Sequence, residues 1–109
     1  MENEFVNYNQ ALALKDLGFD EPCFGYYDEG GNLYTEMVEV LKAPLYQQAF
    51  RWFREKHGID NCISYSRIED NSWYYQYYKS GLVGGFKTYE EAELACLEKL
   101  IEIVEQKEK

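Results

Sequence analysis

The chain has 109 residues, of which 46% are hydrophobic, and a formal net charge of -9 at pH 7. This length predicts a single domain, and the hydrophobic content excludes an intrinsically disordered chain. The acidity disfavours binding to a phosphate backbone, so we expect nucleic acid to be an unfavourable partner.

A first helix is predicted between Asn7 and Gly18. The Asn7 side chain can cap the helix start, and Gln10 stands three residues later, as in a capping box. Gly18 can end the helix in the left-handed conformation, and Pro22 prevents its continuation.

Residues 23–35 predict a β-hairpin. The aromatic segment 23–27 and the segment 33–35 are typical of strands, and the Asp-Glu-Gly-Gly-Asn sequence between them is a turn signal. Residues 36–41 fit a strand and a helix equally well, so both interpretations stay open.

A second helix is predicted from Pro44, which suits a first helical turn, to Gly58. Its apolar side chains recur at helical spacing and predict one buried face. That face comprises Leu45, Tyr46, Ala49, Phe50, Trp52 and Phe53.

Two further strands are predicted at residues 63–68 and 73–78, with a third short strand at 82–83. In the aromatic strand, alternation places Trp73, Tyr75 and Tyr77 on one face. The opposite face then carries Tyr74, Gln76 and Tyr78.

The last helix is predicted to start at Thr88, which forms a capping box with Glu91. Two adjacent apolar rows indicate a helix docked on a sheet; they comprise Tyr89, Ala92, Cys96, Leu97, Leu100, Ile101, Ile103 and Val104. The polar remainder is predicted to be covered by Glu90, Glu93, Glu98, Glu102 and Glu105.

These elements predict an α+β fold in the order α-ββ-α-ββ(β)-α, with one or two antiparallel sheets packed against amphipathic helices. Residues 1–109 form one domain in this interpretation. No long apolar run and no signal-peptide layout is present in the sequence, so we expect no membrane association and a cytoplasmic location.

No motif in the sequence predicts catalysis, a metal or a cofactor. Cys23, Cys62 and Cys96 are widely spaced without a C-x-x-C pair, which favours three buried free thiols over a disulfide or zinc. The single histidine, His57, is the only imidazole available to a catalytic dyad. We therefore expect a protein that is not an enzyme and holds no metal or cofactor.

The aromatic content points instead to interaction with other proteins. The chain has eleven Tyr, six Phe and two Trp, and Tyr and Trp dominate binding hot spots. We expect docking to an unknown protein partner, accompanied by self-association. The candidate interaction residues are Tyr26, Tyr27, Tyr34, Trp52, Tyr74 and Tyr78.

Three alternatives remain open. Seven acids and no Lys or Arg occur from residue 16 to 41, and six acids against one Lys from 88 to 105, as in an inhibitor that mimics nucleic acid. The aromatic strand at 73–78 is also compatible with single-stranded nucleic-acid binding. The third alternative is an enzyme that uses His57 beside a cysteine or carboxylate.

Three stretches carry a resemblance, namely residues 11–27, residues 43–56 and the closing helix at 88–93 and 97–101. They resemble small acidic, Tyr-rich proteins of no known activity that gut-bacterial and phage genomes encode. The resemblance implies a phage or mobile-element setting and carries over no site residue. The Phe86, Thr88, Glu90, Glu91 and Ala92 positions are also similar to the ends of partial RNase H antitoxins and of small three-stranded DNA-reading domains.

Overall fold

The computed structural model describes residues 4–35, 41–66, 71–78 and 81–107. Within them lie three helices and two three-stranded antiparallel sheets, which confirms the α+β prediction. In chain order the elements are α1 (Tyr8–Asp16), β1 (Gly25–Tyr27), β2 (Leu33–Tyr34), β3 (Leu41–Ala43), α2 (Tyr46–His57), β4 (Asn61–Ser66), β5 (Ser72–Tyr77), β6 (Val83–Phe86) and α3 (Tyr89–Lys107).

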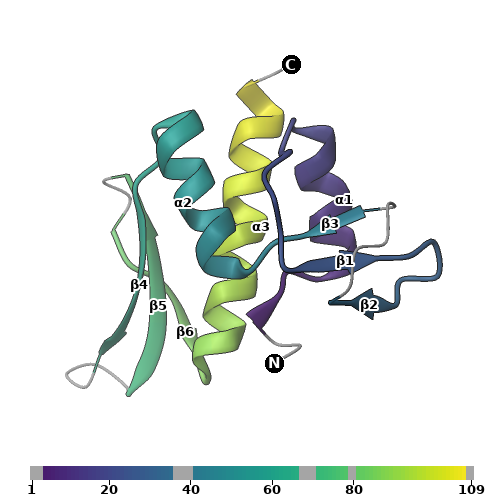
Figure 1. Ribbon diagram of the computed structural model, residues 1–109. Helices are drawn as coiled ribbons and strands as arrows, with labels where there is room; N and C mark the ends of the chain where they lie inside the picture. Colours follow the sequence, from purple (N-terminus) through teal and green to yellow (C-terminus); the bar gives the residue numbers. More distant parts are fainter. Residues whose placement is uncertain (1–3, 36–40, 67–70, 79–80, 108–109) are drawn as a thin grey trace.

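Helix α3 runs through the middle of the molecule and joins its two halves (Figure 1). The β4–β5–β6 sheet packs on one side of it, while α1 and the smaller β2–β1–β3 sheet lie on the other. This placement follows from the two apolar rows of α3, whose Cys96, Leu97, Leu100 and Val104 are almost completely buried. The burial of these apolar side chains contributes most of the free energy that holds the two halves together.

The predicted capping box of α1 is present. Asn7 Oδ1 accepts a hydrogen bond from the Gln10 backbone N–H at 2.8 Å, and Gln10 Oε1 accepts one from the Asn7 N–H at 3.1 Å. The hairpin β1–β2 is confirmed as well, with Asp28 Oδ1 accepting from the backbone N–H groups of Gly30 and Asn32 in its turn.

Asn7→Ala is expected to lower the free energy of unfolding by about 1 kcal/mol, because the Gln10 backbone N–H loses its side-chain acceptor. Urea denaturation measures this change. Asn9→Ala is the matched control, since Asn9 is exposed in the same helical turn and should change stability by less than about 0.5 kcal/mol. Equal effects of the two substitutions would contradict the capping role.

The prediction for the start of α2 was wrong by two residues. Pro44 precedes the helix, because residues 5–6 hold this segment in an extended conformation: Val6 N–H donates to the Pro44 carbonyl at 3.0 Å, and Phe5 pairs with Leu45. Leu45 is the N-cap, and Gly58, with φ 66°, ends the helix in the left-handed conformation. Of the ambiguous segment 36–41, only Leu41 lies within the described residues, in β3.

The faces of β5 are as the alternation predicts. Trp73 contacts Tyr89 of α3, Lys99 of α3 lies over the Tyr77 ring, and Tyr75 belongs to the hydrophobic core. The predicted short third strand is β6, which extends through Gly84 and Gly85. A Cβ at Gly84 would lie 2.6 Å from the Phe86 ring, so only glycine fits this edge without a shift.

The expectation of three buried cysteines was wrong for Cys62. Cys96 is buried and Cys23 is half-buried, but Cys62 is exposed because it lies on the β4 face that points away from the helices. All three thiols are free.

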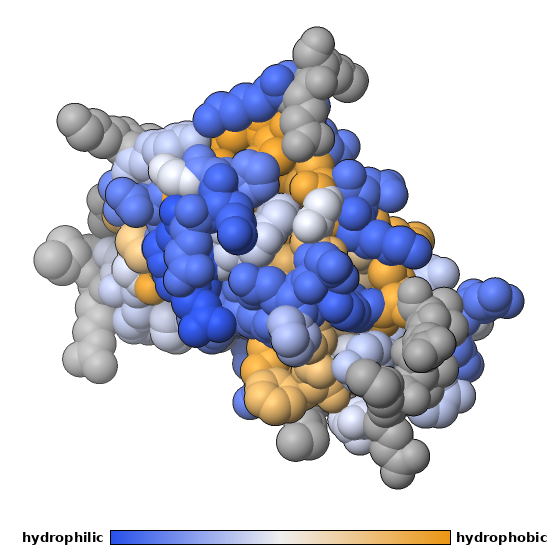
Figure 2. Space-filling view, turned by 45° about the horizontal axis from the view of Figure 1, so that its top comes forward, coloured by the Kyte–Doolittle hydropathy of each residue, from blue (hydrophilic) through white to orange (hydrophobic). Residues whose placement is uncertain are grey.

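Hydrophilic side chains cover most of the face shown in Figure 2, with smaller hydrophobic areas between them. Among the described residues, no helix has the length and apolar character that a membrane span requires.

Candidate functional site

An acidic hollow lies between the N-terminal parts of α2 and α3. This pocket has a volume of about 440 Å³ and is called the Glu93 pocket. Its lining combines aromatic rings, one amide and three carboxylates, and the lining residues within the described part of the chain include no Lys, Arg or His. They are Glu4, Leu45, Tyr46, Gln47, Tyr89, Glu90 and Glu93.

Glu93 is the unusual residue of this pocket, because only 6% of it is exposed. The Tyr89 hydroxyl and the Gln47 amide lie close enough to its carboxylate to favour the charged form. Gln47 Nε2 donates to Tyr89 Oη at 2.9 Å, which fixes these two side chains beside the carboxylate. Such a buried, oriented carboxylate is a candidate binding group.

The environment of Glu93 opposes its negative charge. Burial is the main cause that raises its pKa from the ordinary 4.5 to about 7. The negative charges of Glu90 and Glu4 act in the same direction, while the neighbouring Tyr89 hydroxyl and Gln47 amide act in the opposite one. A positive group that enters the pocket would offset the desolvation and the repulsion together. The pocket is therefore suited electrostatically to a cation.

The floor of the pocket is rigid. The Tyr46 hydroxyl donates to Gln10 Oε1 at 2.9 Å, and Gln10 Nε2 donates to the Leu94 carbonyl at 3.2 Å. The buried Gln10 side chain thus ties all three helices together beneath the pocket. Burial, followed by the nearby charge of Glu93, raises the pKa of Tyr46 to about 12, so its hydroxyl stays a donor at neutral pH.

A row of aromatic rings leads away from the pocket along the second sheet. Tyr89 packs edge-on against Trp73, with ring centroids 5.2 Å apart, and Trp73 packs against Tyr65 at 5.1 Å. Tyr65 is 44% exposed. Next to this row a smaller slot of about 170 Å³ separates α2 from β4. It is lined by Gln47, Phe50, Arg54, Asn61, Cys62, Ile63 and Tyr89.

The Glu93 pocket and the slot are neighbours, because Gln47 and Tyr89 line both. The hydrogen bond between these two side chains forms the partition. The two hollows therefore lie side by side, with carboxylates lining one and Arg54 lining the other.

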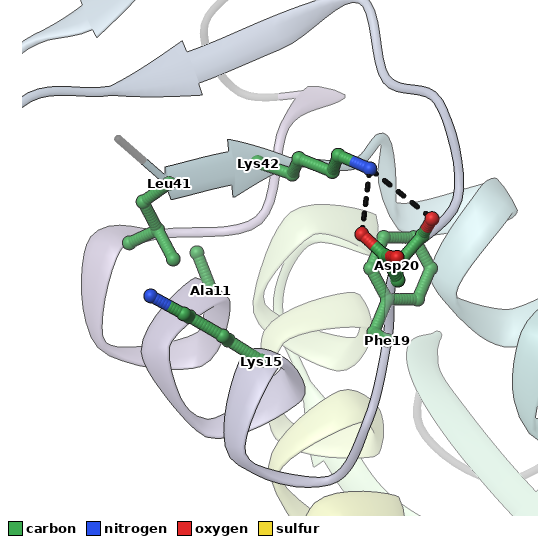
Figure 3. Close-up of a pocket in the computed structure, with 6 residues that line it drawn as sticks. All are labelled: Ala11, Lys15, Phe19, Asp20, Leu41 and Lys42. Carbon is green, nitrogen blue, oxygen red and sulfur yellow. Dashed lines mark hydrogen bonds and ion pairs between the residues drawn. The ribbon is translucent and has the colours of Figure 1, made fainter. Parts of the chain in front are cut away.

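A third hollow of about 130 Å³ lies between α1 and β3, with Ala11, Phe19 and Leu41 as its apolar wall (Figure 3). Lys42 Nζ is engaged there, since it donates to Asp20 Oδ1 at 2.8 Å and to the Asp20 carbonyl at 3.1 Å. This hydrogen bond and ion pair lowers the pKa of Asp20. Because Lys42 and Asp20 are paired with each other and its volume is small, this hollow is the weaker binding candidate.

The six predicted interaction residues are divided between core and surface. Tyr27, Trp52 and Tyr74 are buried and offer little area to a partner. The Tyr27 hydroxyl donates to the Val6 carbonyl at 2.7 Å, and Trp52 packs between Phe19 and Phe53. Tyr26 is half-buried, while Tyr34 and Tyr78 are 42% and 43% exposed.

The rings of β5 that could stack nucleic-acid bases are largely turned toward the helices, and Tyr74 on the opposite face is buried. His57 packs against Trp52 and Phe53, with ring centroids 4.8 and 5.8 Å apart. Of the acidic segments, Glu93 is buried rather than on a solvent face, and Glu36 and Glu39 lie outside the described residues. Within the described part of the chain, no cluster of three or more His, Cys, Asp or Glu could hold a metal ion.

Sequence reasoning missed Glu93, which was expected on the exposed side of the last helix. The signal was present: Glu93 stands four residues after Tyr89 and three before Cys96, in register with the apolar row. A charged residue at such a position has to be buried or has to interrupt the row.

Comparison with known proteins gives no further guide. No protein-family model, no curated protein and no solved structure matches this chain.

Proposed function

We propose that the protein is a non-enzymatic protein-interaction module whose Glu93 pocket receives the cationic side chain of a basic protein partner. The observation that carries this proposal is the buried carboxylate of Glu93 in a pocket lined by two further glutamates and no cation among its described residues. Charge complementarity of this kind sets partner choice and speeds association. The phage or bacterial-host setting implied by the resemblance is part of the proposal.

Arginine is the side chain that the lining suits best. Its planar guanidinium has five donors, and Glu4, Glu90 and Glu93 supply carboxylate acceptors. The rings of Tyr46 and Tyr89 offer faces for cation–π contact. The acidity of the whole chain adds long-range attraction for a basic partner.

The test is an NMR titration of the protein with Nα-acetyl-arginine methylamide, compared with the citrulline analogue, a neutral isostere. We expect a dissociation constant on the order of 1 mM for arginine at pH 8, with shifts at Gln47, Tyr89 and Glu93. Affinity should fall several-fold at pH 6, because Glu93 is then mostly protonated.

Two variants of α3 distinguish binding in the Glu93 pocket from general attraction to the negative charge of the protein. Glu93→Gln removes the charge inside the pocket and should abolish measurable arginine binding. Glu98→Gln removes the same charge from an exposed position on the same helix and should leave binding unchanged. Equal binding of arginine and citrulline, or equal loss in both variants, would reject the proposal.

A further inference from the structure

Strand β4 is an open edge of the second sheet, since the strand order is β4-β5-β6. It carries no charge and no proline, although such features usually protect an exposed edge. The opposite edge is different, because β6 is interrupted by Gly84 and Gly85 with positive φ and by a register shift. Of the two edges of this sheet, β4 is therefore the regular one and is suited to accept another strand.

The register shows which backbone groups of β4 face outward. Tyr78 N–H donates to the Asp60 carbonyl at 2.9 Å, one step beyond the Asn61–Tyr77 pair. Hydrogen-bonded and non-hydrogen-bonded pairs alternate in an antiparallel ladder. Cys62 and Ser64 therefore bond inward to β5, whereas the N–H and C=O groups of Asn61, Ile63 and Tyr65 point to the open edge.

Helix α2 lies beside the Asn61 end of this edge, since Phe50 and Arg54 bond to the Asn61 side chain. Helix α3 packs over β5, and α2 packs beside α3 on the β4 side. Packed helices lie about 8–10 Å apart, whereas neighbouring strands lie about 4.8 Å apart. By these spacings, a strand added to β4 would run beneath α2, along the slot between α2 and β4.

The charges along the edge differ from one end to the other. Arg54 donates to Asn61 Oδ1 at 3.3 Å, so the Asn61 end is positive. At the other end, Tyr65 connects through Trp73 to Tyr89, which lines the Glu93 pocket with Glu90 and Glu93. An occupant with a basic residue near Tyr65 and a neutral or acidic one near Arg54 complements both ends.

We propose that an extended segment of the protein partner adds to the open edge of β4, antiparallel to it and beneath α2, with a basic side chain directed into the Glu93 pocket. This inference rests on the proposed function and adds how the partner is held. Backbone hydrogen bonds to Asn61, Ile63 and Tyr65 supply affinity, and the pocket supplies selectivity, as in other cases of strand addition.

A second copy of this chain fits the edge less well than a single extended segment. Symmetric pairing of two β4 strands would bring the second α2 into the layer that the first α2 already occupies. The two α2 helices would then compete for the same space above the paired strands, whereas a single extended segment brings no helix with it.

The first experiment titrates the protein with a capped hexapeptide of sequence TVTRTV, whose arginine and second and last residues share one strand face. We expect a dissociation constant below about 1 mM and at least tenfold slower amide hydrogen exchange at Asn61, Ile63 and Tyr65 at saturation. Methylation of the arginine amide nitrogen should abolish binding, since this N–H pairs with β4. Methylation of the following threonine nitrogen, which points away, should be tolerated.

A pair of variants tests the edge from the side of the protein. Tyr65→Pro removes an N–H that points outward and leaves the β4–β5 ladder intact, while Tyr65→Thr loses the same ring but keeps the N–H. We expect at least tenfold weaker peptide binding for Tyr65→Pro than for Tyr65→Thr. If Tyr65→Pro does not fold, the methylated peptides decide the question.

The outcomes separate the two proposals. Three results would overturn strand addition: equal binding of both methylated peptides, no peptide binding, or a dimer that forms through β4 without peptide. Binding of Nα-acetyl-arginine methylamide would still support the pocket in each case. Equal affinity for the arginine peptide and its citrulline form would overturn the cationic part and the proposed function with it.

Discussion

Glu93→Gln is expected to raise the free energy of unfolding by about 3 kcal/mol at pH 8 and by less than about 0.5 kcal/mol at pH 4. The expected gain follows from the pKa of Glu93, which burial raises from 4.5 to about 7 in the folded protein. A pKa difference of this size corresponds to about 3 kcal/mol once both states are ionised.

The sign of this pH dependence is set by proton uptake. Between pH 4.5 and 7 the folded state keeps the Glu93 proton that the unfolded chain has lost, so the stability due to this group is present below pH 4.5 and is lost as the pH rises through 7. Glutamine has nearly the same shape as glutamate and carries no charge at any of these pH values.

Urea denaturation of the wild type and the variant at pH 4, 6 and 8 measures this difference. Glu98→Gln is the matched control, because Glu98 is exposed on the same helix and its loss should change stability by less than about 0.5 kcal/mol at each pH. A Glu93→Gln variant that is less stable than the wild type at pH 8 would contradict the buried-carboxylate interpretation. Together with lost arginine binding, a gain in stability would show that Glu93 is retained at a cost to the fold.

Phe53→Ala is expected to lower the free energy of unfolding by about 3–5 kcal/mol. Phe53 is completely buried, and its ring packs edge-on against Trp52 with centroids 5.1 Å apart. The backbone around it is also fixed, since the Phe53 carbonyl accepts hydrogen bonds from the N–H groups of Gly58 and Ile59 and closes the end of α2. Truncation would leave a cavity where α2 meets the core.

Chemical denaturation at low temperature measures this loss, which is a large fraction of the stability of a typical small domain. Phe24→Ala is the control for the loss of a phenyl ring, because Phe24 is 73% exposed and its truncation should cost less than about 0.5 kcal/mol. Phe53→Leu should fold and keep most of the stability. A cost below about 1 kcal/mol for Phe53→Ala would show that the core can close over the missing ring.

Local signals in the sequence were sufficient for most elements. The capping box at Asn7 and Gln10 gave the start of α1, and the apolar rows of 89–104 gave α3, because both depend only on residues a few positions apart. The start of α2 was misplaced because a distant segment, residues 5–6, holds Pro44 and Leu45 in an extended conformation. Such pairing between remote residues leaves no mark near Pro44.

The candidate site could not be predicted from short sequence patterns, because its residues are also far apart in the chain. Gln47 and Glu93 are 46 positions apart in the chain, and only the packing of α2 on α3 brings them together. The sequence could not predict which tyrosines are buried either. Tyr27 and Tyr34 both lie in short aromatic strands of the same hairpin, but they are on opposite faces of it, and only Tyr27 is buried. The alternation in β5, by contrast, was sufficient to group Trp73, Tyr75 and Tyr77.

The central position of α3 also bears on how the protein forms during synthesis. Both halves of the core close on this helix, yet residues 89–107 follow every other element in the chain. Until the ribosome has released them, the β4–β5–β6 sheet lacks the helix on which its aromatic face packs. We therefore expect folding to complete only after α3 emerges, with the aromatic face of β5 exposed to chaperones during the interval.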